Sequence, residues 1–279
     1  MPSAIPAPTL NRIFAVVSLI VLTPALLLVM DFPAPTISAD VLGSALSFQL
    51  NQNALLLLAL PVLTVLGTDW VLQDHPEVRA GIVRFLFPFW TVPAVAALTL
   101  ALLLTRAQAL PTWLLGLVLG GLSIGLLIAA EYNIIASGSS AYEISRVGVN
   151  IASQVLGLLL FVLIHSTRER SLVTATGALA VAFALAVGML APHLIGNRRG
   201  LGASALIALL IGQAMWALNY VRISSASAGI VLLAIFHISI TLVQQHLQMQ
   251  GKQERQTAAE FALIVIGSII LLWAFEFSK

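Results

Sequence analysis

The chain has 279 residues, of which 59% are hydrophobic and only 9% are charged, and its formal net charge is +2. With a mean hydropathy of +1.03, it lies outside the range of soluble globular proteins. The small, mixed charge excludes a nucleic-acid-binding surface. The absence of cysteine excludes disulfides, thiolate metal sites and iron–sulfur clusters.

Apolar stretches separated by short polar connections occupy almost the whole chain. A helix needs about 20 apolar residues to cross a hydrocarbon core of roughly 30 Å. The stretches are continuous and rich in Leu and Ala, without the two-residue alternation of a membrane barrel. The sequence predicts an all-α, polytopic transmembrane helical bundle of eight to nine spans, at 13–30, 54–72, 85–104, 113–130, 147–164, 172–191, 201–218, 226–243 and 258–275. No connection is long enough for a soluble domain, so residues 1–279 are expected to form one transmembrane domain.

Two features near the N-terminus leave alternatives open. Arg12 precedes the first apolar run and small residues follow it, as in a secretory signal, but the run is long for one. Residues 41–50 are apolar and lead into a Gln- and Asn-rich segment, so we expect a short helix in the membrane interface. If that segment crosses the membrane instead, the span count changes.

Lysine and arginine positions predict the orientation, because positively charged loops tend to stay in the cytoplasm. An internal N-terminus places eight basic residues inside and five outside. The inside set is Arg12, Arg79, Arg84, Arg146, Arg198, Arg199, Lys252 and Arg255, and the outside set is Arg106, Arg168, Arg170, Arg222 and Lys279. We therefore expect the N-terminus inside and the C-terminus outside; the expected location, the bacterial cytoplasmic (inner) membrane, rests on the family resemblance given below.

The connection after the second span carries an acidic cluster in the sequence TDWVLQDHPEVR. It contains Asp69, Asp74, His75 and Glu77. Carboxylates grouped in this way at the inner face could hold Mg²⁺ and a diphosphate headgroup, although their spacing matches no metal-binding signature. A solvated turn stopped by Pro76 explains the same residues more simply.

Polar residues near the ends or inside other spans define a candidate pathway. Glu131 follows the fourth span, Gln213 lies in the seventh, His237 lies in the eighth and Glu260 enters the ninth. Together with Asp69 they could bind a cation or relay protons, since ionisable residues in the membrane are costly and usually functional. For each acid alone, solvation at the interface is the simpler explanation. His237 and Gln213 are more commonly bonded to a neighbouring helix.

Glycines in the fourth span predict close helix contact. Two overlapping pairs with four-residue spacing are formed by Gly116, Gly120, Gly121 and Gly125. No Gly-Lys-Ser/Thr follows and no strand precedes, so this is not a phosphate-binding loop. Pro88 and Pro93 predict a kink in the third span.

Three functions fit these features. A small-solute or ion transporter is favoured, with a non-catalytic accessory or scaffold subunit as the alternative and a lipid-acting enzyme as a further alternative. No catalytic residue and no cofactor are predicted, and a retinal Schiff base is excluded because no lysine lies within a span. The expected partners are the lipid bilayer and either other membrane proteins or a second copy of the chain.

The segments TDWVLQDHPEV, AAEYN and GQAMWALNY are spread over most of the chain. Together they resemble an uncharacterised family of bacterial polytopic membrane proteins that carries only a domain-of-unknown-function label. The resemblance implies an all-helical inner-membrane protein. It implies no activity and no catalytic residue.

Overall fold

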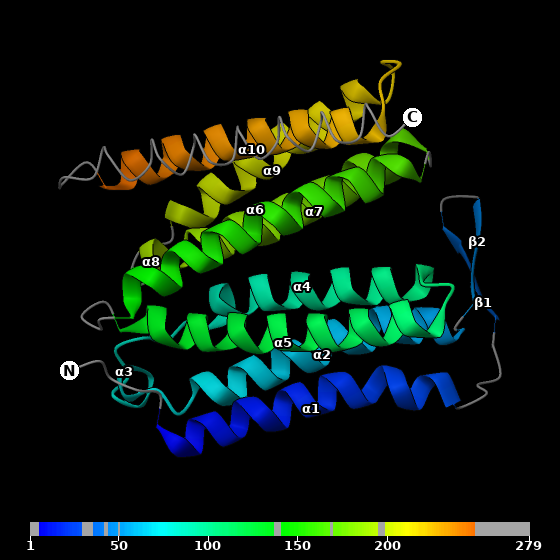
Figure 1. Cartoon of the computed structure of the whole chain (residues 1–279). Helices are drawn as coiled ribbons and strands as arrows, with labels where there is room; N and C mark the ends of the chain where they lie inside the picture. Colours follow the sequence, from blue (N-terminus) through cyan, green and yellow to red (C-terminus); the bar gives the residue numbers. More distant parts are fainter. Residues whose placement is uncertain are drawn as a thin grey trace. The chain divides into compact units, whose positions relative to one another are not determined.

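The computed structural model describes residues 6–29, 36–41, 44–49, 51–136, 141–167, 170–194 and 199–248. Within these ranges, eight helices are long and apolar enough to cross a membrane. They are α1 (Ala7–Val29), α2 (Gln52–Leu72), α4 (Phe87–Arg106), α5 (Leu110–Ile135), α6 (Tyr142–Ser166), α7 (Ser171–Met189), α9 (Arg199–Leu218) and α10 (Ser225–Gln248). Two short helices, α3 (Pro76–Arg79) and α8 (Ala191–Leu194), lie between them (Figure 1).

These eight helices confirm the first eight predicted spans, and the ninth, 258–275, lies outside the described residues. Large apolar side chains are exposed along the helices, among them Leu126 (72%), Leu206 (70%) and Phe14 (63%). Water would penalise such surfaces, whereas hydrocarbon solvates them. The protein is a multi-pass membrane protein.

Two paired strands lie between α1 and α2 in the chain. The strands β1 (Thr36–Val41) and β2 (Ser44–Gln49) pair antiparallel, with Thr36 opposite Gln49 and Val41 opposite Ser44. The prediction of a short interface helix over 41–50 is therefore wrong. In β1, residues alternate strictly between polar and apolar in the sequence TISADV, which is the two-residue period of a strand rather than the 3.6-residue period of a helix.

The start of α2 is fixed by a capping residue. Asn51 precedes the helix, and its side-chain Oδ1 accepts a hydrogen bond from the backbone N–H of Ala54 at 2.9 Å. Such a bond satisfies one of the amide groups that a helix leaves unpaired at its N-terminus. The second span therefore begins near residue 52 rather than near 41.

The helices gather into two compact units, Met1–Val149 and Asn150–Lys279, called unit 1 and unit 2 below. In unit 1, α1 packs against α2 and α5, and α4 packs against α2 and α5. Figure 1 shows the four ribbons running alongside one another. That residues 1–279 form a single domain stays a prediction.

In unit 2, α9 packs between α7 and α10. The part of α6 from Asn150 onward lies against α7 and α10 through two glycines. A Cβ on Gly157 would lie 3.4 Å from Leu185 of α7, and one on Gly229 of α10 would overlap the side chain of Val162. Small residues thus bring these helices close together, as in other membrane bundles.

Candidate functional site

The polar connection between α2 and α4 folds into an ordered turn. Pro76 occupies the first turn of α3, where a missing N–H costs nothing, and the Nδ1 of His75 accepts a hydrogen bond from the Glu77 N–H at 3.2 Å. Gly81 follows α3 with a φ of +72°. The N–H of Ile82 bonds back to the Glu77 carbonyl at 3.0 Å, which completes a Schellman motif and explains why glycine stands at position 81.

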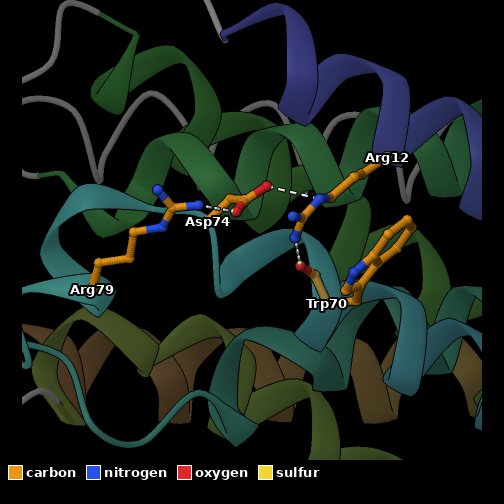
Figure 2. Close-up of polar contacts among 4 residues, drawn as sticks. All are labelled: Arg12, Trp70, Asp74 and Arg79. Carbon is orange, nitrogen blue, oxygen red and sulfur yellow. Dashed lines mark hydrogen bonds and ion pairs between the residues drawn. The ribbon is translucent and has the colours of Figure 1, made fainter.

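Arg12 of α1 joins this turn to the end of α2 (Figure 2). Its Nε lies 2.8 Å from Oδ2 of Asp74, and its Nη1 donates to the Trp70 carbonyl at 3.0 Å. Its guanidinium carbon also lies 4.8 Å from the centre of the Trp70 ring. Arg79 pairs with the other oxygen of Asp74. Arg12 thus connects α1 with the end of α2 and with the turn that follows it, through three interactions.

This arrangement bears on the proposed metal site at the acidic cluster. Asp74 is occupied by two guanidinium groups, and Asp69 accepts a hydrogen bond from Gln73 at 2.6 Å. Within the described part of the chain, no three His, Asp, Glu or Cys side chains are placed to hold a metal ion. Asp69, Asp74 and Glu77 therefore do not form the divalent-ion centre that the lipid-acting enzyme would need.

His75 lies in the same turn and packs against a neighbouring helix. Its ring packs edge-on against Tyr132 of α5, with 4.7 Å between the ring centres. Burial lowers the pKa of His75 below its ordinary value, because the charged imidazolium loses solvation. A neutral ring agrees with its hydrogen bond, since only an unprotonated Nδ1 can accept from the Glu77 N–H.

Glu131 lies next to Tyr132, in the last turns of α5. Its exposed fraction is zero. Neither of its carboxyl oxygens has a hydrogen-bond partner among the residues that the structure describes. Solvation by water or headgroups at the interface, the simpler explanation from the sequence, therefore does not apply to this side chain. The helix continues past the predicted end at 130 to Ile135, which places Glu131 inside the span.

His237 belongs to a separate polar site in unit 2. Its Nδ1 lies 3.2 Å from Nε2 of Gln154 on α6, and both side chains are buried. Since an amide nitrogen only donates, Nδ1 is the acceptor. Gln244, seven residues after His237 on α10, donates to the Met189 carbonyl at the end of α7 at 3.4 Å. These bonds connect α6, α7 and α10.

The other residues of the predicted pathway are placed differently. Gln213 and Trp216 are exposed on α9, and Tyr220, just beyond the end of that helix, is exposed as well. The Nε1 of Trp216 donates a hydrogen bond to the Tyr220 hydroxyl at 3.1 Å. This stripe therefore faces the surroundings of unit 2 rather than its buried His237, as aromatic residues near a span end commonly do. Glu260 lies outside the described residues.

The glycines of α5 contact two different helices. A Cβ on Gly116 would lie 3.7 Å from Leu104 of α4, and one on Gly120 would overlap Leu100. On the adjoining face, Cβ atoms on Gly121 and Gly125 would lie 2.6 and 2.7 Å from side chains of α1, those of Val21 and Val17 respectively. The glycine face is therefore occupied within unit 1, and it offers no free surface to a partner protein.

Two residues at these sites have partners that the sequence pattern does not reveal. From the sequence alone, Arg12 is only a positive charge that helps to predict the orientation. Gln154 was visible as a polar residue within a span, which is a sign of a partner on another helix. Only the packing of the helices shows which partner that is.

One protein family matches the chain. The model of a family described as "Protein of unknown function (DUF5656)" matches residues 32–275. No match is found among curated proteins or among solved structures. Since the family model spans most of the chain, from just before β1 to the last predicted span, this multi-pass membrane protein belongs to the DUF5656 family of proteins of unknown function.

Proposed function

We propose that the protein is a small-solute or ion transporter in which Glu131 binds and releases a cation or a proton. The observation that supports this proposal is the complete burial of Glu131 within a membrane span, without a described hydrogen-bond partner. A charged side chain costs about 2.5–3.5 kcal/mol or more at the centre of the membrane and less toward its edges. A carboxyl group kept at such a position is typical of ion and proton pathways.

Nothing on the described surface favours the accessory-subunit alternative in the same way. Its expected contact face, Gly116 to Gly125, is filled by α1 and α4. Among the described residues, Asp69, Asp74 and Glu77 do not gather into a metal-binding group, so the structure offers the lipid-acting enzyme no comparable support. The burial of Glu131 is the observation that favours the transporter over these two alternatives.

The test is a flux measurement on proteoliposomes that contain the purified full chain. A potassium diffusion potential drives cations inward, and an enclosed pH-sensitive dye reports proton entry, while a sodium-sensitive dye is used in parallel. Glu131→Gln should reduce the flux at least about tenfold, since the amide cannot ionise. Glu143→Gln is the matched control because Glu143 is exposed in the first turn of α6. Equal flux in the wild type and Glu131→Gln overturns the proposal.

The orientation and location are part of the same proposal. We propose a location in the bacterial inner membrane, and the bias of basic residues supports an orientation with the N-terminus inside. Because the chain has no cysteine, single cysteines at the exposed positions Ala80 and Gln108 report the topology directly. An impermeant thiol reagent added outside intact cells should label Gln108→Cys and spare Ala80→Cys. The opposite pattern would reverse the orientation.

A further inference from the structure

We propose that the exposed face of α9 is an interface between two copies of the chain, and that the two Gln213 side chains bond to each other across it. The inference concerns an interaction surface of unit 2 and does not depend on the role proposed for Glu131. Three observations carry it: the spacing of the exposed residues on α9, the surroundings of the Gln213 amide, and the lack of charged residues along this face.

The exposed residues of α9 form one stripe, called the α9 face below. The helix packs against α7 and α10, and a Cβ on Gly212 would lie 3.1 Å from Leu179 of α7. The residues of the α9 face are Gly202, Leu206, Leu209, Gln213 and Trp216, all of them exposed. They follow one another at spacings of four, three, four and three residues, which is the average repeat of 3.5 residues by which two helices pack along their length.

Gln213 is the polar member of the α9 face. It lies five residues before the end of the helix at Leu218, which is about 8 Å along the axis. Side chains of a helix point toward its N-terminus, so the amide of Gln213 is directed away from the nearer end of the span and into the hydrocarbon. An amide without a hydrogen-bond partner is costly in that surrounding.

The amide of Gln213 has no hydrogen-bond partner among the residues that the structure describes. Exposed hydroxyl groups in other spans are satisfied within their own helices. Ser123 and Thr176 each donate to the carbonyl four residues earlier, at 2.7 and 2.8 Å. Gln213 makes no such bond, and lipid tails cannot supply one. It therefore needs a partner from another protein surface.

A second copy of the chain supplies that partner. A glutamine side chain carries both a donor and an acceptor, so two Gln213 amides related by a two-fold axis can exchange a pair of hydrogen bonds. Both copies have the same orientation in the membrane, so their α9 helices run parallel and each residue of the face meets its own equivalent. The sequence between Arg199 and Arg222 contains no charged residue, so no like charges oppose the contact.

Disulfide cross-linking tests the interface directly, because the chain has no cysteine of its own. Gln213→Cys is introduced into the full chain, membranes with a low content of the protein are oxidised, and the covalent product is identified by mass spectrometry. Thr176→Cys is the matched control, since Thr176 is exposed within a span of the same unit. Two cysteines join only when their Cα atoms lie within about 7 Å, so the dimer yield of Gln213→Cys should be at least about fivefold higher than that of the control.

A second pair of variants tests the amide itself. Leu206→Cys, on the same face, should also form the dimer. Its yield should fall about threefold or more when Gln213→Leu is added, and Gln213→Asn should preserve it because asparagine keeps both hydrogen-bonding groups. The contact joins two chains, so Gln213→Leu should leave the stability of a single chain in dilute micelles unchanged.

The outcomes separate this inference from the proposed function. Equal dimer yields for Gln213→Cys and Thr176→Cys overturn the interface, and so does a covalent product that contains a different polypeptide. Leu206→Cys decides the matter if Gln213→Cys does not fold. A Leu206→Cys yield that Gln213→Leu does not change overturns the pairing of the amides. A dimer that meets every expectation in a protein without flux supports the interface and contradicts only the transporter.

Discussion

Arg12 on α1 and Asp74 beyond the end of α2 form an ion pair with 2.8 Å between Nε and Oδ2 (Figure 2). The side chain of Asp74 is only 10% exposed, whereas Arg79, its second partner, is 66% exposed. The two arginines should therefore differ in importance. Arg12 also bonds the backbone and ring of Trp70, so it connects two helices, while Arg79 stays within one turn.

We expect Arg12→Gln to lower the free energy of unfolding by about 1–3 kcal/mol, because a charge-assisted hydrogen bond, a partly buried ion pair and a cation–π contact are lost together. Arg79→Gln should cost less than about 1 kcal/mol. Unfolding in mixed micelles with increasing SDS measures both. A double-mutant cycle with Asp74→Asn isolates the pair, and a coupling energy near zero would contradict the assignment of Arg12.

The glycine contacts of α5 predict a difference between neighbouring positions. Gly121→Ala should destabilise the protein by about 1 kcal/mol, since overpacking costs about 1–3 kcal/mol and alanine recovers up to about 1 kcal/mol of helix propensity. The stiff Val21 side chain, 2.6 Å from the added methyl, has little freedom to move away.

Gly116→Ala is the matched control on the same helix. Its methyl would meet Leu104 at 3.7 Å, an ordinary contact, so only the propensity gain remains and stability should be equal or higher. Thermal unfolding in detergent compares the two variants. Equal effects at both positions would show that α1 does not approach α5 as closely as described.

The hydrogen bond between Gln154 and His237 should stabilise the packing of α6 against α10. Gln154→Leu is expected to cost about 0.5–2 kcal/mol, the range found for polar contacts between membrane helices. Gln213→Leu, at an exposed position of unit 2, should change stability by less than about 0.5 kcal/mol. If the two substitutions have equal effects in SDS unfolding, the bond contributes nothing measurable.

His75 should make stability depend on pH. Its pKa is lower in the folded protein than the ordinary value of about 6.5. Below that ordinary value the unfolded chain binds a proton that the folded protein does not, so stability falls as the pH falls toward the folded-state pKa. The thermal midpoint should therefore drop between about pH 7 and pH 5.5.

His75→Gln supplies the control for this pH dependence. Glutamine cannot titrate, and its side-chain oxygen can still accept from the Glu77 N–H. Most of the drop in thermal midpoint should disappear in this variant. An unchanged pH profile would assign the dependence to another group.

Glu131 and Glu260, two acids of the predicted pathway, illustrate which features of a site can be predicted from sequence. Both Glu131 and Glu260 were recognised as polar residues at span ends, where water or headgroups could solvate them. Burial argues against solvation at the interface for Glu131, and burial depends on which helices surround a residue. Glu260 lies outside the described residues and stays a prediction.

The same limit explains the corrections. Gln213 and Gln154 are both amides within spans, but only Gln154 faces a partner helix. The strand alternation of Thr36 to Val41 was present in the sequence, yet a six-residue pattern is easily passed over beside spans of about 20 residues. A segment of six residues is too short to distinguish clearly the two-residue period of a strand from the 3.6-residue period of a helix.

The sequence by itself determined the membrane class, the first eight spans and the glycine pattern of α5, because hydrocarbon imposes a length and an apolar composition that each segment must satisfy alone. Only the tertiary structure decided that Arg12 pairs with Asp74, that Gln154 bonds His237, and that Glu131 is buried. Those relationships join residues far apart in the chain, and they are fixed by the rotation and register of packed helices, which apolar composition leaves open.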